Sequence, residues 1–141
     1  MIQRIQTVYL FLGALALAAM GGFDTPWDST AAATLGWYTP TVLGLLVVTI
    51  GTALGSIFLY TQRKTQRSVV VGAQVLTVGL AGVLYGGLYM TEELHFGGAV
   101  GLQWDRTVAL LLPVLAYGLF WLARRGIDHD IELVKSMDRL R

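Results

Sequence analysis

The sequence predicts an all-α integral membrane protein: four transmembrane helices in an antiparallel bundle, both termini cytoplasmic, and a short amphipathic C-terminal helix. Two observations indicate this class. Four long apolar runs fill a chain of 141 residues that is 55% hydrophobic and 13% charged, whereas soluble domains carry about 25% charged residues. Nine of the ten basic residues lie on one side of those runs, as in membrane proteins with basic cytoplasmic loops.

The first apolar run covers residues 5–23 and follows Arg4. A basic residue, a short apolar run and a small-residue end at Ala16–Met20 also occur in cleavable secretory signals. We expect a retained helix instead, because the first span is needed to keep all the basic loops on one side of the membrane. Both termini are then cytoplasmic.

The second, third and fourth runs cover residues 41–60, 68–90 and 106–123. Pro40 precedes the second run, at a position where a missing N–H costs nothing. The connection at residues 61–67 is short, so the second and third helices form a tight antiparallel hairpin. The fourth run is near the lower limit of about 17 residues for a span. Pro113 lies within it and predicts a kink.

Residues 126–141 predict a short amphipathic helix on the cytoplasmic side, since apolar residues recur there at steps of three and four. Acidic residues begin this segment and basic residues end it, which suits the helix dipole. Two interpretations stay open: a helix lying along anionic headgroups, or one that docks on a partner. Together with the inner loop, the expected contact surface comprises Arg63, Lys64, Arg67, Ile131, Val134, Lys135, Met137, Arg139, Leu140 and Arg141.

Glycines form a face on each helix of the predicted hairpin. Such faces let helices approach closely in lipid, where no hydrophobic force drives helices together. We expect the hairpin itself to use at least one face, and the alternative is a docking face for another subunit. The candidates are Gly44, Gly51 and Gly55 on the second helix, and Gly72, Gly79, Gly82 and Gly86 on the third.

The spans contain little that supports chemistry. Gln74 is the one strongly polar side chain inside them, and we expect a structural hydrogen bond to a hydroxyl of the second helix: Thr49, Thr52 or Ser56. Charged and histidine side chains are missing between the ends of the runs, which argues against a proton pump and a bis-histidine haem. Without cysteine there is no thiolate site. We therefore expect no catalytic residue, cofactor or resident metal.

The two outer loops, residues 24–40 and 91–105, hold aromatic residues and a few polar candidates. Glu92, Glu93 and His95 could ligate a metal, but a solvated surface is the preferred interpretation. The Gly-rich segment 96–102 either lies on the membrane surface or forms a short hairpin. The loop aromatics predict an interfacial belt; they are Trp27, Trp37, Tyr38, Phe96 and Trp104, with Tyr85 and Tyr89 nearby.

Three cytoplasmic segments carry a resemblance to a known family. They are the start, Met1–Leu10, the basic turn, Tyr60–Gln66, and the end, Arg125–Arg141. They resemble the corresponding segments of DUF4293, an uncharacterised membrane family of Bacteroidota. The resemblance implies a four-helix protein of the inner membrane, and it supplies no activity, cofactor or catalytic residue.

These observations lead to one hypothesis and two alternatives. The hypothesis is a small non-catalytic accessory, assembly or scaffolding subunit of a larger bacterial inner-membrane complex, of respiratory or secretion type. Its expected partners are other membrane subunits and lipids with anionic headgroups, and not nucleic acid. The first alternative is a lipid- or quinone-binding protein that uses the outer aromatics and a groove near Pro113. The second is a membrane enzyme or transporter with an outer-loop site that adds Asp105 and Arg106 to the loop candidates.

Overall fold

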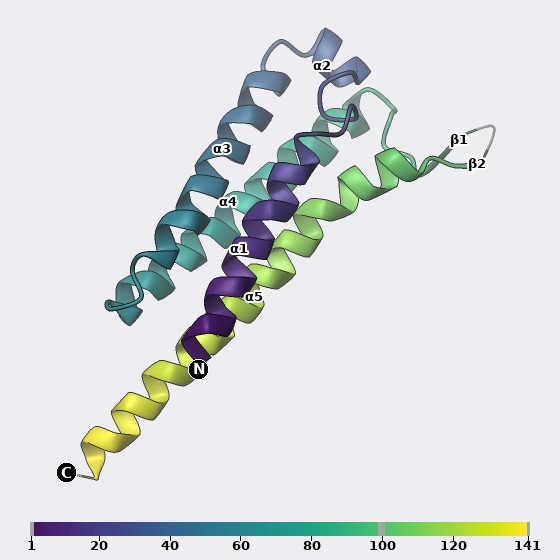
Figure 1. Ribbon diagram of the computed structural model, residues 1–141. Helices are drawn as coiled ribbons and strands as arrows, with labels where there is room; N and C mark the ends of the chain where they lie inside the picture. Colours follow the sequence, from purple (N-terminus) through teal and green to yellow (C-terminus); the bar gives the residue numbers. More distant parts are fainter. Residues whose placement is uncertain (1, 99–100, 141) are drawn as a thin grey trace.

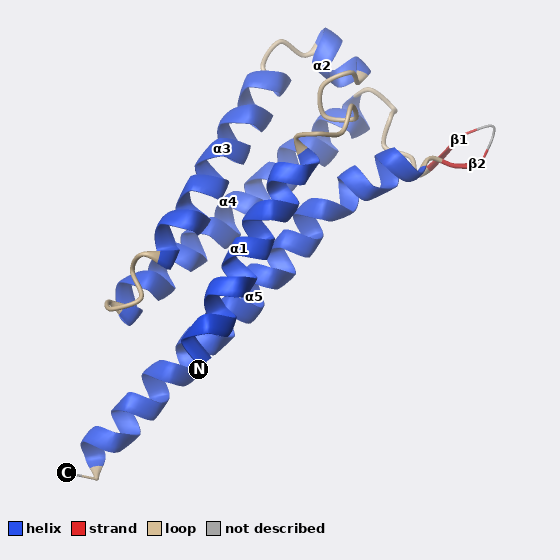
Figure 2. Cartoon of the chain, in the orientation of Figure 1, coloured by secondary structure: helices blue, strands red, loops and turns tan. Residues whose placement is uncertain are grey.

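The computed structural model describes residues 2–98 and 101–140. Four long helices lie side by side, a short helix covers one end, and a small β-hairpin extends from that end (Figures 1 and 2). The strands pair antiparallel, with Gly97 opposite Leu102. The elements are α1 (Ile2–Met20), α2 (Thr30–Thr34), α3 (Tyr38–Ile57), α4 (Arg63–Met90), β1 (Gly97–Gly98), β2 (Gly101–Leu102) and α5 (Trp104–Arg139).

The all-α prediction is confirmed, and the composition of the helices suggests a membrane protein. Among the described residues, α3, α4 and α5 are long and apolar enough to cross a membrane. The apolar part of α1 that was assessed, Ile5–Met20, is shorter than those three. A fourth span and the orientation of the termini therefore stay predictions.

All four long helices begin earlier than the apolar runs indicated, and the difference is largest for α4. α3 begins at Tyr38 instead of residue 41, so Pro40 lies in its first turn, where the backbone N–H has no acceptor within the helix. α4 begins at Arg63 instead of residue 68. The basic residues assigned to the inner loop are therefore helical. They project from the first turns of α4, and the connection between α3 and α4 is only a few residues long.

The prediction of a separate C-terminal helix is wrong, because α5 continues without interruption for 36 residues. At 1.5 Å per residue this is about 54 Å, compared with about 30 Å for a hydrocarbon core. Two contacts stabilise α5 near residues 124–126, where the sequence indicated that the fourth span leaves the membrane. Arg124 forms an i,i+4 ion pair with Asp128, and the side chain of Gln6 packs against Gly126. The helix also continues through Pro113.

The apolar core runs along the whole bundle. α1 packs antiparallel to α5, because Gly13 faces Phe120 and Gln6 faces Asp130 near the other end of the contact. α3 and α4 form the expected antiparallel hairpin, and α4 also packs on α5. The largest fully buried side chains are Tyr38, Phe120, Leu10, Leu17, Met20, Leu80, Leu84, Leu88, Leu110, Ile127, Val42 and Val70.

The predicted glycine faces do not pack the hairpin, so that expectation is wrong. A Cβ atom built at any of the seven glycines would meet nothing within 4 Å beyond its own helix and chain neighbours. The close approaches are instead at Gly13, Gly87 and Gly126, where a Cβ would lie 2.5 Å from Phe120, 2.3 Å from Tyr38 and 2.9 Å from Gln6. The face glycines are Gly44, Gly51, Gly55, Gly72, Gly79, Gly82 and Gly86, and they leave open space beside α3 and α4.

Gln74 is buried as expected, but not through the expected bond. The hydroxyls of Thr49 and Ser56 each donate to a carbonyl of their own helix, at 2.6 Å. Thr52 does the same at 2.7 Å. No hydrogen bond between Gln74 and these hydroxyls is present within the described residues. Helix carbonyls outcompete a neighbouring side chain because they lie within reach of every helical Ser or Thr hydroxyl.

Candidate functional site

A cluster of polar and charged side chains lies where the starts of α1 and α4 meet the second half of α5 (Figure 1). We call it the polar end, and it consists of Gln6, Arg63, Arg67, Asp128 and Asp130. These residues come from three helices that are far apart in the sequence. The polar end therefore ties together the same three segments that carry most of the basic residues.

Asp130 is the centre of this cluster, since its side chain is buried with only 6% of its surface exposed. Its carboxylate accepts a hydrogen bond of 2.8 Å from Nε2 of Gln6. Its backbone carbonyl accepts a bond of 3.3 Å from Nη1 of Arg63. Gly126, one helical turn earlier, makes room for Gln6, because a Cβ there would lie 2.9 Å from Cγ of Gln6. Asp130 thus links α5 to both α1 and α4.

Asp128 forms a second link between α5 and α4. Its carboxylate accepts a hydrogen bond from Nε of Arg67. It also lies 3.7 Å from Nε of Arg124 on the preceding helical turn. Because these side chains are partly exposed, each ion pair is expected to contribute no more than about 1 kcal/mol. Their main effect is to fix the direction of α5 relative to the bundle.

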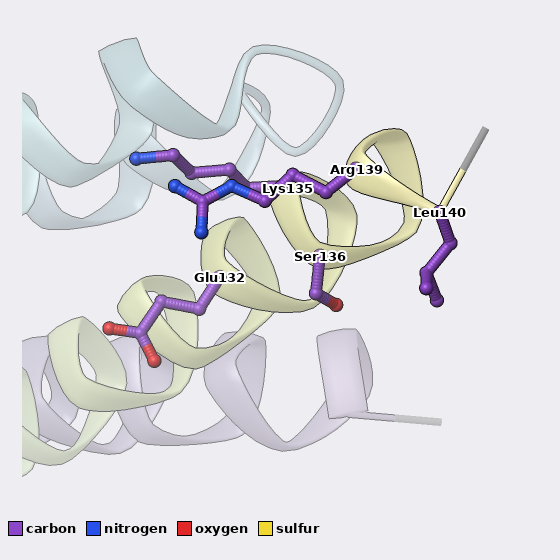
Figure 3. Close-up of a pocket in the computed structure, with 5 residues that line it drawn as sticks. All are labelled: Glu132, Lys135, Ser136, Arg139 and Leu140. Carbon is purple, nitrogen blue, oxygen red and sulfur yellow. The ribbon is translucent and has the colours of Figure 1, made fainter.

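The structure places the predicted cytoplasmic contact residues in two groups. Arg63 and Arg67 join the polar end. Lys64 lines an open groove beside it with Ile131. Lys135 and Arg139 lie on the outer turns of α5, where their side chains extend toward the same side along a shallow groove (Figure 3). Val134 and Met137 lie on the last turns of α5 and Leu140 at its C-cap, and Arg141 lies outside the described residues.

The last turns of α5 extend beyond the other helices (Figure 1). We call residues 131–140 the α5 extension. Four apolar side chains on it are exposed: Leu133 by 40%, Val134 by 46%, Met137 by 68% and Leu140 by 89%. They form an apolar surface that no described part of the chain covers.

The opposite end of the molecule brings together two of the three weak outer-loop candidates. The carboxylate of Glu93 accepts hydrogen bonds from the backbone N–H and the hydroxyl of Thr30, at 2.8 and 2.9 Å, at the start of α2. Arg106 donates to the carbonyl of Glu93 at 3.2 Å, and its Nη1 lies 3.1 Å from Nε2 of His95. Glu92 is exposed and has a φ of 59°. These contacts fasten α2 to the end of α4.

The outer cluster does not have the composition of a metal site. Among the described residues, no group of three or more His, Asp, Glu or Cys side chains converges closely enough to hold a metal ion. Arg106 lies between the candidate ligands, and its positive charge opposes a cation there. The geometry therefore gives Glu93 a structural role in positioning α2.

One member of the predicted aromatic belt belongs to the core instead. Tyr38 is fully buried, and its ring lies against Gly87 of α4. The absence of a side chain at Gly87 creates the space that the ring fills. Other members remain exposed at this end, among them Trp37, Tyr89, Phe96 and Trp104.

The groove near Pro113 is shallow and apolar. It has a volume of about 200 Å³, below the range of about 300–1,000 Å³ that is typical of small-molecule sites. Neither Tyr85 nor Trp104 lines it. Tyr85 instead donates its hydroxyl to the carbonyl of Leu110 on α5. The groove does not have the convergent polar groups that would orient a quinone.

Three residues of the polar end were not found from the sequence: Gln6, Asp128 and Asp130. A usable signal existed for Asp130, because it falls on the same 4–3 spacing as the buried residues Phe120, Ala123 and Ile127. An acidic residue on the inward stripe of a helix requires a buried partner. Gln6 gave no comparable signal, since its position opposite α5 depends on how the helices pack.

Comparison with known proteins gives one match. The family model described as Domain of unknown function (DUF4293) matches residues 2–140. No curated protein and no solved structure matches the chain. The matched range includes all the residues of the polar end and the α5 extension.

Proposed function

Because the chain belongs to the DUF4293 family, which carries no assigned function, we propose a role from the geometry of this chain. It is a small non-catalytic accessory, assembly or scaffolding subunit of a larger complex in the bacterial inner membrane. Four helices span the membrane, and both termini are cytoplasmic. Complexes of the respiratory or the secretion type fit the proposal equally.

The observation that carries the proposal is the α5 extension. It presents four exposed apolar side chains on a helix that continues directly from a membrane-spanning segment. Apolar surface on a projecting helix is characteristic of a docking element. The polar end supports this interpretation, since Asp130 and Asp128 hold α5 to α1 and α4 immediately before the extension begins.

The charge distribution supports the proposed orientation. The first turns of α4 carry Arg63, Lys64 and Arg67, and α5 carries Arg124 and Arg125 at the same end. Basic residues next to spans are retained on the cytoplasmic side. They also suit contact with anionic lipid headgroups.

The use of the polar groups supports a non-catalytic role. The carboxylates of Glu93, Asp128 and Asp130 all accept hydrogen bonds from other parts of the chain. Each therefore links two separate parts of the chain, and Asp128 also lines the open groove beside the polar end. A catalytic acid or base must instead be within reach of a substrate.

Affinity purification from native membranes tests the proposal. The full chain, tagged at its N-terminus, is extracted in mild detergent, and the stoichiometry of co-purifying proteins is measured by mass spectrometry. We expect a stoichiometric membrane partner that is lost in the variant Met137→Asp and retained in the control Lys135→Asp, on the opposite side of the helix. Recovery of the wild-type chain only as a free protein, without a stoichiometric partner, would refute an accessory role.

A further inference from the structure

The contact between α1 and α5 follows a regular stripe. Alternating steps of four and three residues connect the buried positions of α5, and such spacing keeps one face of a helix against a neighbouring helix. Phe120 contacts α1 at Gly13, and Asp130 contacts α1 at Gln6. The buried residues on this stripe are Ala109, Pro113, Ala116, Phe120, Ala123, Ile127 and Asp130.

The same spacing continues past Asp130 to Val134 and Met137. Because Gln6 lies opposite Asp130 and α1 is antiparallel, Val134 is near the level of Ile2, the first described residue of α1. Met137 lies beyond it. Their exposed fractions are 46% and 68%, compared with 6% for Asp130. The seam between α1 and α5 therefore continues on α5 where the described part of α1 ends.

The flanking positions widen this exposed seam. Leu133 and Leu140 lie beside it and are exposed by 40% and 89%. The charged side chains Glu132, Lys135 and Arg139 lie toward the other side of the helix, and the groove that they line in Figure 3 is bordered by Leu140. The extension is therefore amphipathic, and its apolar face is the continuation of the face that packs on α1.

In the proposed topology, a straight α5 carries this apolar face out of the hydrocarbon core. Links from Asp128 and Asp130 to α4 and α1 fix the direction of α5. The extension then continues along the axis of the bundle (Figure 1), and its helical part, residues 131–139, is about 14 Å long at 1.5 Å per residue. A helix that binds a membrane surface lies in the plane of the membrane, which would require α5 to bend.

We propose that the α5 extension binds an amphipathic helix of a partner protein, which packs on Val134 and Met137 with the same spacing as the seam between α1 and α5. This inference rests on the proposed accessory function and specifies the surface and the chemistry of the partner. Two layers of a heptad seam are too short to order a free peptide, because isolated helices below about 12 residues are marginal in water. The partner helix is therefore part of a folded domain.

Site-specific photo-crosslinking in native membranes tests the inference. A benzophenone amino acid replaces Val134 or Met137 in the full chain, and Lys135, on the opposite side of the extension, is the matched control. All three positions are exposed, so the substitutions are compatible with folding. We expect protein crosslinks from positions 134 and 137 and little from 135. The crosslinked partner peptide should map to an amphipathic helix, and Leu133→Asp should weaken its crosslinking by at least about tenfold, as expected for loss of an apolar contact.

Several outcomes would overturn the inference. They are crosslinks to a second copy of this chain, crosslinks to lipid without protein, and equal crosslinking from position 135. If a stoichiometric partner still co-purifies with the chain in these cases, the accessory function stands and only the proposed surface is wrong. If no partner co-purifies either, the proposed function fails as well.

Discussion

Replacement of Gly87 by alanine should destabilise the bundle, whereas the same change at the adjacent Gly86 should not. A Cβ at position 87 would lie 2.3 Å from Cδ2 and Cε2 of Tyr38, and a Cβ at position 86 would meet nothing within 4 Å. Carbon atoms in contact are normally about 3.5–4.0 Å apart, so the Tyr38 ring would have to move by more than about 1 Å. Tyr38 is fully buried, and little free space is available for this movement.

The two variants together isolate the cost of the steric conflict. Alanine is a better helix former than glycine by up to about 1 kcal/mol, and this gain applies to both positions. Overpacking of a buried contact costs about 1–3 kcal/mol and applies only to Gly87→Ala. The free energies of unfolding of the two variants should therefore differ by about 1–3 kcal/mol, with Gly86→Ala the more stable.

Unfolding of the purified protein in detergent micelles measures this difference. The fraction of helix is followed by circular dichroism as dodecyl sulfate is added, and the midpoints are compared. Gly87→Ala should lower the free energy of unfolding less in a Tyr38→Leu background than in the wild-type chain, because the ring that causes the conflict is gone. If Gly86→Ala and Gly87→Ala have equal stability, the close packing of α3 on α4 inferred here is wrong.

Three further predictions follow from the contacts at the two ends. Asp130→Leu should destabilise the bundle by about 1–3 kcal/mol, because the amide of Gln6 loses its buried partner. The double variant with Gln6→Leu should recover much of this loss. Additive losses of the two single variants in the same titration would contradict this prediction. Glu93→Gln should accelerate amide hydrogen exchange in α2, because its backbone contact loses a full charge, whereas Glu92→Gln should leave exchange unchanged. A spin label on Val134→Cys, the only cysteine in the variant chain, should be accessible to a water-soluble nickel chelate in liposomes; preferential access to membrane-dissolved oxygen would place the extension in lipid.

The long helices could be predicted from the sequence because apolar runs of sufficient length must be helical in lipid. The ends of these helices could not be predicted in the same way. Hydropathy marks where charged residues begin, but lysine and arginine are good helix formers. α4 therefore includes Arg63 and Lys64, and α5 continues through Arg124 and Arg125 into the segment that was expected to be separate.

The glycines illustrate a second limit. GxxxG spacing shows that Gly51 and Gly55 share one face of a helix, but it does not show which way that face points. The close contacts occur at single glycines, Gly13, Gly87 and Gly126, and each is determined by a side chain from another helix. Such contacts depend on tertiary packing and leave no local pattern in the sequence.

The polar end was partly predictable for a related reason. Arg63 and Arg67 were expected at a cytoplasmic surface because of their charge and their place between two apolar runs. Their partners, Asp128 and Asp130, were assigned to a separate C-terminal helix, since the fourth span was expected to end before them. Once α5 is continuous, Asp130 falls on the inward stripe, and a buried carboxylate there requires a donor such as Gln6.

The continuity of α5 also bears on how a partner would bind. A tail joined by a flexible link would have to be ordered on binding, at a cost in conformational entropy that weakens the complex. The extension is instead the end of a helix already held by Asp130 and Asp128, so its apolar face is pre-organised before any partner arrives. In the proposed complex, Gln6 and Gly126 would contribute to partner binding without touching the partner, because they keep α5 in position. On this reasoning, Gly126→Val should weaken co-purification of the partner even though residue 126 lies two helical turns before Val134.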